Sequence, residues 1–157
     1  IRDRRSPPMQ DSLGIMIKKA NNALARDSDH YAKSLGLTGM QISTINFIAN
    51  NEQHHDLFQR DLELEFNIRK ATCSSLVSKM EAADLLIRVP AKDDGRYKRL
   101  LLTPKARQLA TKIERFFETS EQRMATILGV NTAETYEALR QIAVAFSTPT
   151  HAPENWY

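Results

Sequence analysis

The apolar residues along this chain recur mainly at helical spacing. Over residues 13–35 they fall three or four positions apart, which places their side chains on one face of a helix. After the break "GLTG", Thr38 is a suitable N-cap for a second helix. The same spacing predicts a short helix over about 57–66 and another over about 69–83. The first half of the chain is therefore expected to be helical, with polar turns between the helices.

Residues 85–102 break the helical spacing. The runs "LLIRV" and "LLLT" have the length and composition of short strands, and the charged stretch between them has the composition of a turn. These features predict a β-hairpin. Thr103 and Pro104 follow at once as the cap and first residue of a helix, where the missing proline N–H costs nothing. We expect this helix to reach about Leu128 and a last helix, begun by "GVNTAE", to end near Phe146.

The order of these elements is typical of a winged helix-turn-helix. The short helix and the helix at 69–83 are separated by a turn at Asn67, a residue that tolerates left-handed backbone angles. Such a turn lets two helices cross steeply, and the hairpin that follows takes the place of the wing. The sequence therefore predicts a mainly α fold, formally α+β because of the hairpin.

Basic charge is concentrated in the centre of the chain. The whole chain carries 22 bases and 19 acids, but residues 69–107 hold ten bases and only four acids. A concentrated basic patch is expected of a protein that binds a polyanion, although ordinary protein surfaces carry such patches too. The single cysteine cannot form an internal disulfide, and neither a membrane-spanning run nor a signal-peptide pattern is found. We therefore expect a cytoplasmic protein without a membrane partner.

The predicted helix at 69–83 has one face suited to nucleic acid. Its apolar stripe repeats at i, i+3, i+4 and i+7 and consists of Cys73, Leu76, Val77 and Met80. The other side carries bases and short hydroxyls, with no acid before Glu81, whereas solvated faces usually mix Glu with Lys. Short side chains let a helix lie deep in the major groove, where hydroxyls bond base edges and phosphates. The candidate contacts are Arg69, Lys70, Thr72, Ser74, Ser75, Ser78 and Lys79.

The charged hairpin tip "PAKDDGRYKR" is the second candidate contact region. A wing beside a recognition helix reaches the adjacent minor groove, and a guanidinium such as that of Arg96 suits the negative potential there. Asp94, two residues earlier, is placed to hold Arg96 in one orientation. Phosphate contacts are expected from Arg88, Lys92, Lys98 and Arg99. The alternative for this tip is a solubilising turn with a surface ion pair, worth about 0–1 kcal/mol.

The central half of the chain resembles the MarR (multiple antibiotic resistance regulator) family of winged-helix transcription factors. The resemblance rests on "LTGMQISTINFI", "FQRDLELEFNIRKATCSSLVSKMEAADLLIR" and "DDGRYKRLLLTPKA". Within the last segment, Asp94, Gly95 and Arg96 match the family's Asp-x-Arg wing signature. Asp84, Ser75, Glu63 and Ala106 depart from the family's usual residues, and none of them removes the wing signature. Ser75 stands where the family often has a longer, basic side chain, so base readout is expected to differ there.

The resemblance implies a homodimer that binds double-stranded DNA at a pseudo-palindrome. It implies a DNA-binding domain at 37–104 and a helical dimerisation region formed by an N-terminal helix at 9–36 and C-terminal helices at 105–147. A disordered lead-in at 1–8 and a loose tail at 148–157 complete the predicted organisation. Family members are mostly repressors released by small aromatic or phenolic ligands, so such an effector is expected for this chain as well. A winged helix that binds an acidic protein instead of DNA remains the alternative.

Enzyme activity, metal binding, a redox role and a ligand site near residue 30 have less support in the sequence. No phosphate-cradling glycine loop, catalytic triad or paired-carboxylate motif is present, so we expect no enzyme activity and no cofactor. His54, His55 and Asp56 are adjacent in a polar loop and lack distant partners for a metal, so no metal is expected. Cys73 lies on the apolar stripe and is expected to be packed instead of redox-active. His30, Tyr31 and Arg26 are expected at the surface or at a dimer contact, with a ligand role as the alternative.

Overall fold

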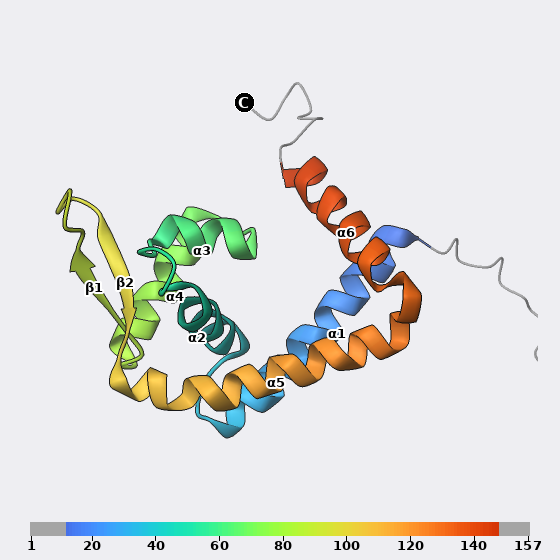
Figure 1. The fold of residues 1–157 in the computed structure, drawn as a ribbon, viewed down its shortest axis with the longest axis horizontal. Helices are drawn as coiled ribbons and strands as arrows, with labels where there is room; N and C mark the ends of the chain where they lie inside the picture. The colour runs from blue at the N-terminus through green and yellow to red at the C-terminus, as the bar shows by residue number, and fades with distance from the viewer. Residues whose placement is uncertain (1–11, 148–157) are drawn as a thin grey trace, which may run out of the picture.

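The computed structural model describes residues 12–147, which form mostly α-helix and one β-hairpin (Figure 1). The lead-in predicted at 1–8 and the tail predicted at 148–157 lie outside the described residues. The elements in chain order are α1 (Leu13–Ser34), α2 (Gly39–Asn51), α3 (Gln59–Phe66), α4 (Lys70–Ala82), β1 (Leu86–Pro90), β2 (Lys98–Leu102), α5 (Pro104–Leu128), the 3₁₀ turn η1 (Gly129–Asn131) and α6 (Thr132–Ser147). This order confirms the predicted fold class.

The elements form a lobe at one end of a long helix (Figure 1). In the lobe, α2, α3, α4 and the hairpin lie together, and α5 leads away from the hairpin beneath α2. The far half of α5 lies beside α1, and η1 then turns the chain into α6, which points away from α5. Every helix among the described residues is too short or too polar to cross a bilayer. The lobe holds the elements predicted to carry the binding surface.

The entry into α2 is fixed by side chains on two helices. Thr38 Oγ1 accepts from the Gln41 backbone N–H at 3.2 Å, and Gln41 Oε1 accepts from the Thr38 N–H at 3.0 Å, a reciprocal cap. Asp29 of α1 accepts from the Gly39 N–H at 2.8 Å. A Cβ at Gly39 would lie 2.6 Å from the Asp29 carboxylate, so glycine allows this close approach of α1 and α2. The cap predicted at Thr38 is confirmed.

The turn between α3 and α4 has the predicted left-handed residue. Asn67 has φ 50°, and its N–H closes the last turn of α3 on Leu64 at 3.3 Å. The start of α3 differs from the prediction, because the helix begins at Gln59 instead of near residue 57. Leu57 and Phe58 are extended instead: the Leu57 carbonyl accepts from the Leu100 N–H at 2.7 Å, and Phe58 bridges Arg99 of β2. The segment before α3 therefore supports the wing.

The hairpin pairs in antiparallel register from Leu86 opposite Leu102 to Pro90 opposite Lys98. Thr103 then joins three elements. Its hydroxyl donates to the Asp84 carbonyl at 2.7 Å and accepts from the Ala106 N–H at 3.2 Å, so it caps α5 while holding the turn after α4. Asp84 in that turn has φ 57°, a left-handed conformation that Asp adopts at lower cost than most residues.

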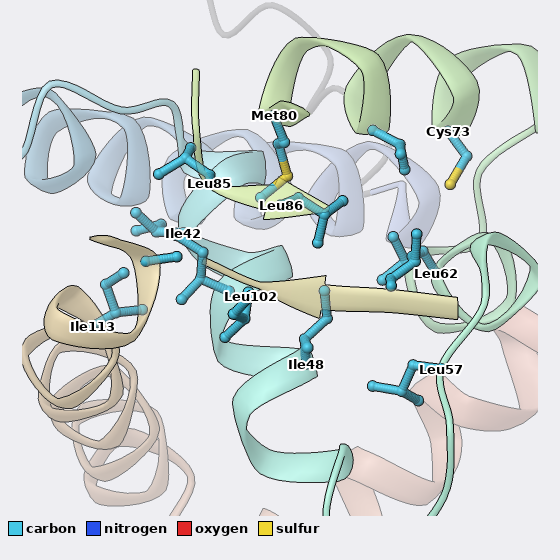
Figure 2. Packing of buried hydrophobic residues seen from close by; sticks show 14 of the residues in the cluster. Ile42, Ile48, Leu57, Leu62, Cys73, Met80, Leu85, Leu86, Leu102 and Ile113 are labelled. Carbon is cyan, nitrogen blue, oxygen red and sulfur yellow. The ribbon is translucent and has the colours of Figure 1, made fainter. Parts of the chain in front are cut away.

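The hydrophobic core fills the space between α2, α4, the hairpin and the first half of α5 (Figure 2). Three of the four residues in the predicted α4 stripe, Cys73, Val77 and Met80, are fully buried there. Leu76 is only partly buried because it faces the start of α2, where Met40 leaves one side open. Around this core the lobe is well packed, which gives the surface side chains of α4 a rigid base.

Candidate nucleic-acid interface

The outer side of α4 carries the predicted row of bases and short side chains. Because Cys73, Val77 and Met80 face the core, the opposite side of the helix is turned outward. Six of the seven candidate contacts on this helix are exposed, namely Arg69, Lys70, Thr72, Ser75, Ser78 and Lys79. The helix thus presents an acid-free surface for its first three turns, and Glu81 in the last turn is the first carboxylate.

Ser74 is the exception among these residues, since it is half-buried against α3. Its hydroxyl oxygen accepts from the Gln59 side-chain amide at 2.8 Å. Gln59 was not among the predicted site residues, because a polar residue in the first turn of a helix is common. The only available signal was the helix-turn-helix order itself, which brings the start of the first helix against the second.

Arg88 of β1 connects the wing to α4. Its Nε donates to Glu81 Oε1 at 2.8 Å. One of its two terminal guanidinium nitrogens lies 3.3 Å from the Ser78 hydroxyl oxygen. Arg88 was predicted to contact phosphate, and the structure pairs it with a carboxylate at the surface. The ion pair places the first strand of the wing beside the last turns of α4, so the two predicted contact regions share one edge of the lobe.

The hairpin tip brings Asp94 and Arg96 together as predicted. The guanidinium of Arg96 lies 2.7 Å from Asp94 Oδ2, and the Arg96 backbone N–H donates to Asp94 Oδ1 at 3.0 Å. These hydrogen bonds from Arg96 lower the pKa of Asp94 below its ordinary value, so the pair stays charged at neutral pH. The Arg96 side chain is still 86% exposed. A charged group is therefore held in one orientation while remaining accessible.

The other bases of the wing divide into two groups. Lys92 and Lys98 are exposed, and the Lys98 ammonium donates to the Gly95 carbonyl at 2.8 Å across the turn. Arg99, predicted to contact phosphate, is directed elsewhere: its guanidinium lies 3.5 Å from Asp56 and its side chain is only 27% exposed. The cause is the bridge between Arg99 and Phe58, which turns this part of β2 toward the segment before α3. The phosphate contact of Arg99 stays a prediction, with its guanidinium turned toward Asp56.

Two further expectations concern His54, His55 and Cys73. Both histidines are exposed, and within residues 12–147 no three His, Cys, Asp or Glu side chains are grouped to hold a metal. Cys73 is fully buried, as predicted from its place on the stripe, and its thiol lies 3.6 Å from the Gln59 carbonyl. Burial, with a smaller contribution from the negative charge of Glu63, raises the pKa of the Cys73 thiol to about 11. At neutral pH the thiol is therefore neutral.

The residues singled out near the end of α1 have different surroundings. His30 is exposed. Tyr31 stacks on Phe116 with ring centroids 4.4 Å apart, and its hydroxyl donates to the Lys112 carbonyl at 3.1 Å. Tyr31 therefore connects α1 to α5 within the chain. A separate open cleft of about 550 Å³ lies between α2 and α5, lined by Asn46, Asn50, Glu114, Phe117, Glu118, Glu121 and Gln122.

The chain is similar to known transcriptional regulators in both sequence and structure. Residues 35–96 match the model of the MarR family. A transcription regulator MarR from Oenococcus oeni PSU-1 is 32% identical, with a TM-score of 0.77 over 85% of this chain and 99% of that one. No curated protein matches the sequence.

Two DNA complexes have the same fold at lower sequence identity. The MepR–DNA complex of S. aureus has a TM-score of 0.73 and 19% identity over 85% of this chain and 96% of that one. A MarR family regulator from Listeria monocytogenes, complexed with 26mer DNA, has a TM-score of 0.72 and 23% identity over 87% of this chain and 89% of that one. At these identities the two likenesses concern the fold alone.

Proposed function

Because this chain belongs to the MarR family of transcriptional regulators, we propose that it binds a specific double-stranded DNA operator as a homodimer. The observation that carries the proposal is the outer side of α4, where bases and hydroxyls are exposed without a carboxylate until Glu81. Arg96, which is held by Asp94, lies at the tip of the hairpin. Arg88 of the same hairpin is hydrogen-bonded to Glu81 of this helix. The DNA complexes of MepR and of the Listeria regulator support the proposal by their shared fold.

Each predicted contact has a role in this proposal. Helix α4 enters the major groove, where its hydroxyls approach base edges and the bases at its start approach phosphates. The wing places Arg96 in the neighbouring minor groove, with Asp94 orienting it. The major-groove set is Arg69, Lys70, Thr72, Ser74, Ser75, Ser78 and Lys79, and the phosphate contacts from the wing are Arg88, Lys92 and Lys98.

The homodimer is supported by apolar side chains that one protomer leaves uncovered. None of the residues of α6 is buried, and Tyr136, Val144 and Phe146 are 70%, 63% and 82% exposed. Exposed apolar residues continue at the end of α5, in η1 and along α1, at Ile127, Val130, Leu13, Ile15 and Met16. Patches of this kind mark protein–protein contacts. We propose that a second copy covers them by twofold symmetry, so that residues 9–36 and 105–147 form the dimerisation region and 37–104 the DNA-binding domain.

A twofold dimer defines the geometry of the operator. The two copies of α4 would enter successive major grooves about 34 Å apart, one turn of the duplex. The operator is therefore expected to be a pseudo-palindrome whose half-sites are related by the same twofold axis as the protein. A dimer bound across a promoter excludes polymerase, so the proposed role is that of a repressor acting in the cytoplasm.

A small aromatic or phenolic effector is part of the same proposal. The cleft between α2 and α5 offers the Phe117 ring for stacking and the amides of Asn46 and Asn50 for a hydroxyl. Its three carboxylates, Glu114, Glu118 and Glu121, favour a neutral phenol over a ligand that carries its own carboxylate. Addition of a neutral phenol to the DNA complex should release DNA at lower concentration than the matching benzoic acid does, and the opposite order would contradict this assignment.

Salt dependence tests the proposed function. Binding of a duplex should weaken as salt is raised, with a slope of log affinity against log salt of about −0.9 for each phosphate neutralised. An operator sequence should retain an advantage over unrelated duplex at every salt concentration. If the basic face instead served an acidic protein partner, all duplexes would bind alike and weakly, and no sequence advantage would be measured.

A further inference from the structure

Gln59, the first residue of α3, is held against α4 by three contacts. Its side-chain amide nitrogen lies 2.8 Å from the Ser74 hydroxyl oxygen and 3.5 Å from the Lys70 carbonyl oxygen. Its own backbone carbonyl lies 3.6 Å from the Cys73 sulfur. The start of α3 is therefore fastened to the first turns of α4 through both side chain and backbone, and the amide points to a predicted contact residue.

The contact sets the hydrogen-bonding direction of Ser74. An amide N–H can only donate, so the Ser74 oxygen is the acceptor and the hydroxyl proton is left for another partner. Within residues 12–147 the Ser74 hydroxyl takes part in this hydrogen bond alone, as the acceptor. Ser74 is half-buried, and its neighbours one turn away on the same edge, Lys70 and Ser78, are both exposed. The proton is therefore available at the edge of the proposed interface.

Building on the proposed DNA binding, we propose that Gln59 is a positioning residue for sequence recognition: it fixes the Ser74 hydroxyl as a donor to an acceptor atom on a base edge. A hydroxyl without such a partner rotates and both donates and accepts. The major groove offers acceptors on guanine, adenine N7 and thymine O4, whereas cytosine presents only its amino donor there. With Gln59 in place, one of the two lone pairs of the Ser74 oxygen is occupied and its O–H points away from the amide, so Ser74 favours a base that presents an acceptor.

Ser75 provides an internal comparison. It follows Ser74 directly and is exposed. It lines an open depression between α4 and the start of α2, away from Gln59. Its hydroxyl therefore keeps its freedom to rotate. Loss of Ser75 should alter preference at a different base position from loss of Ser74, and removal of Gln59 should leave the Ser75 position unchanged.

Selection of bound duplexes from a random pool tests this inference, run in parallel on the full-length wild type and its variants. Gln59→Met keeps the length of the side chain without the donor, and Ser74→Ala removes the hydroxyl. Both should relax preference at the same half-site position by about threefold to tenfold, the loss expected for one neutral hydrogen bond, and the double variant should add little. Gln59→Glu accepts the Ser74 proton, so it should shift that position toward a base that presents an amino donor, cytosine or adenine. Gln53→Met, in the exposed turn after α2, is the matched control and should select the wild-type sequence.

The outcomes separate this inference from the function on which it rests. A wild type that selects no sequence overturns the proposed function, and the inference with it. A wild type that selects a sequence, with Gln59→Met reducing binding to all duplexes equally or not at all, overturns the inference alone. Thermal unfolding of each variant checks that it is folded. If Gln59→Met does not fold, the comparison is made between Gln59→Glu and Ser74→Ala. The inference holds if both variants change base preference at the same half-site position and is overturned if they do not.

Discussion

Asp94 holds Arg96 by hydrogen bonds to both its guanidinium and its backbone N–H, at 2.7 and 3.0 Å. Two residues apart in a tight turn, they form a charged pair in which the base remains 86% exposed. An isolated surface pair of this kind adds little to stability. The pair restricts the rotamers of Arg96 before binding, so less side-chain entropy is lost when Arg96 contacts DNA. Such pre-organisation generally increases affinity.

Substitutions at Arg96 and Asp94 distinguish the effect of side-chain orientation on DNA affinity from the effect of charge. Arg96→Ala should weaken binding to every duplex and reduce the magnitude of the salt slope by about 0.9, because one cation is removed. Asp94→Asn removes a negative charge, so simple electrostatics predicts tighter binding, whereas loss of orientation predicts weaker binding. We expect weaker binding in fluorescence anisotropy titrations at fixed salt. Arg96→Lys is the control for charge and should keep the slope while losing affinity.

If Arg96→Ala leaves operator affinity unchanged, the wing does not contact DNA as proposed. If Asp94→Asn binds more tightly than the wild type, the carboxylate acts only as a local repulsive charge and the orienting role is wrong.

Thr103 is a buried polar residue at the junction of the wing and α5, and its hydroxyl is expected to contribute to stability. Thr103→Val keeps the shape of the side chain but removes the donor to Asp84 and the acceptor for the Ala106 N–H. The loss of a helix cap together with a second hydrogen bond should lower the free energy of unfolding by about 1–3 kcal/mol. Urea denaturation measures this change. Thr103→Ser keeps the hydroxyl and should stay close to the wild type, and equal losses for both variants would contradict the role of the hydroxyl.

The apolar side of α6 should determine the oligomeric state. Deletion of residues 131–157 should convert the dimer to a monomer in light scattering, because it removes the uncovered Tyr136, Val144 and Phe146. Leu139→Asp should weaken the dimer within the intact chain. Ala145→Asp adds the same charge at an exposed position on the opposite side of α6 from Tyr136, and it serves as the control that stays dimeric. A dimer that survives the deletion would place the interface elsewhere.

The buried thiol of Cys73 predicts a pH dependence of stability. Its pKa is raised to about 11 in the folded protein, above the ordinary value of 9.0, so folding favours the neutral thiol. The contribution is fully present below pH 9.0 and is lost as the pH rises to about 11, because the unfolded chain ionises first. Cys73→Ser should flatten this loss in urea denaturation across that range. A disulfide reagent should react slowly with the folded protein at pH 8, and fast reaction there would reopen a redox role.

The sequence predicted the features that depend on neighbours along the chain. Thr38 as a cap, Asn67 in a left-handed turn and the pair of Asp94 and Arg96 all follow from residues within a few positions of one another. Packing between distant segments decided the rest. The contact of Gln59 with Ser74 requires the crossing of α3 and α4, and the direction of Arg99 requires the extended backbone at Phe58. Neither is encoded in a local pattern.

Selection of bound duplexes by the wild-type protein decides whether this chain reads a DNA sequence, because one experiment gives both DNA binding and the half-site. Repeated rounds should converge on one pseudo-palindrome with half-site centres about one turn, or 34 Å, apart. The measured affinity for this duplex should exceed that for scrambled duplex at the same salt. A pool that stays random after selection in dilute buffer would contradict the account.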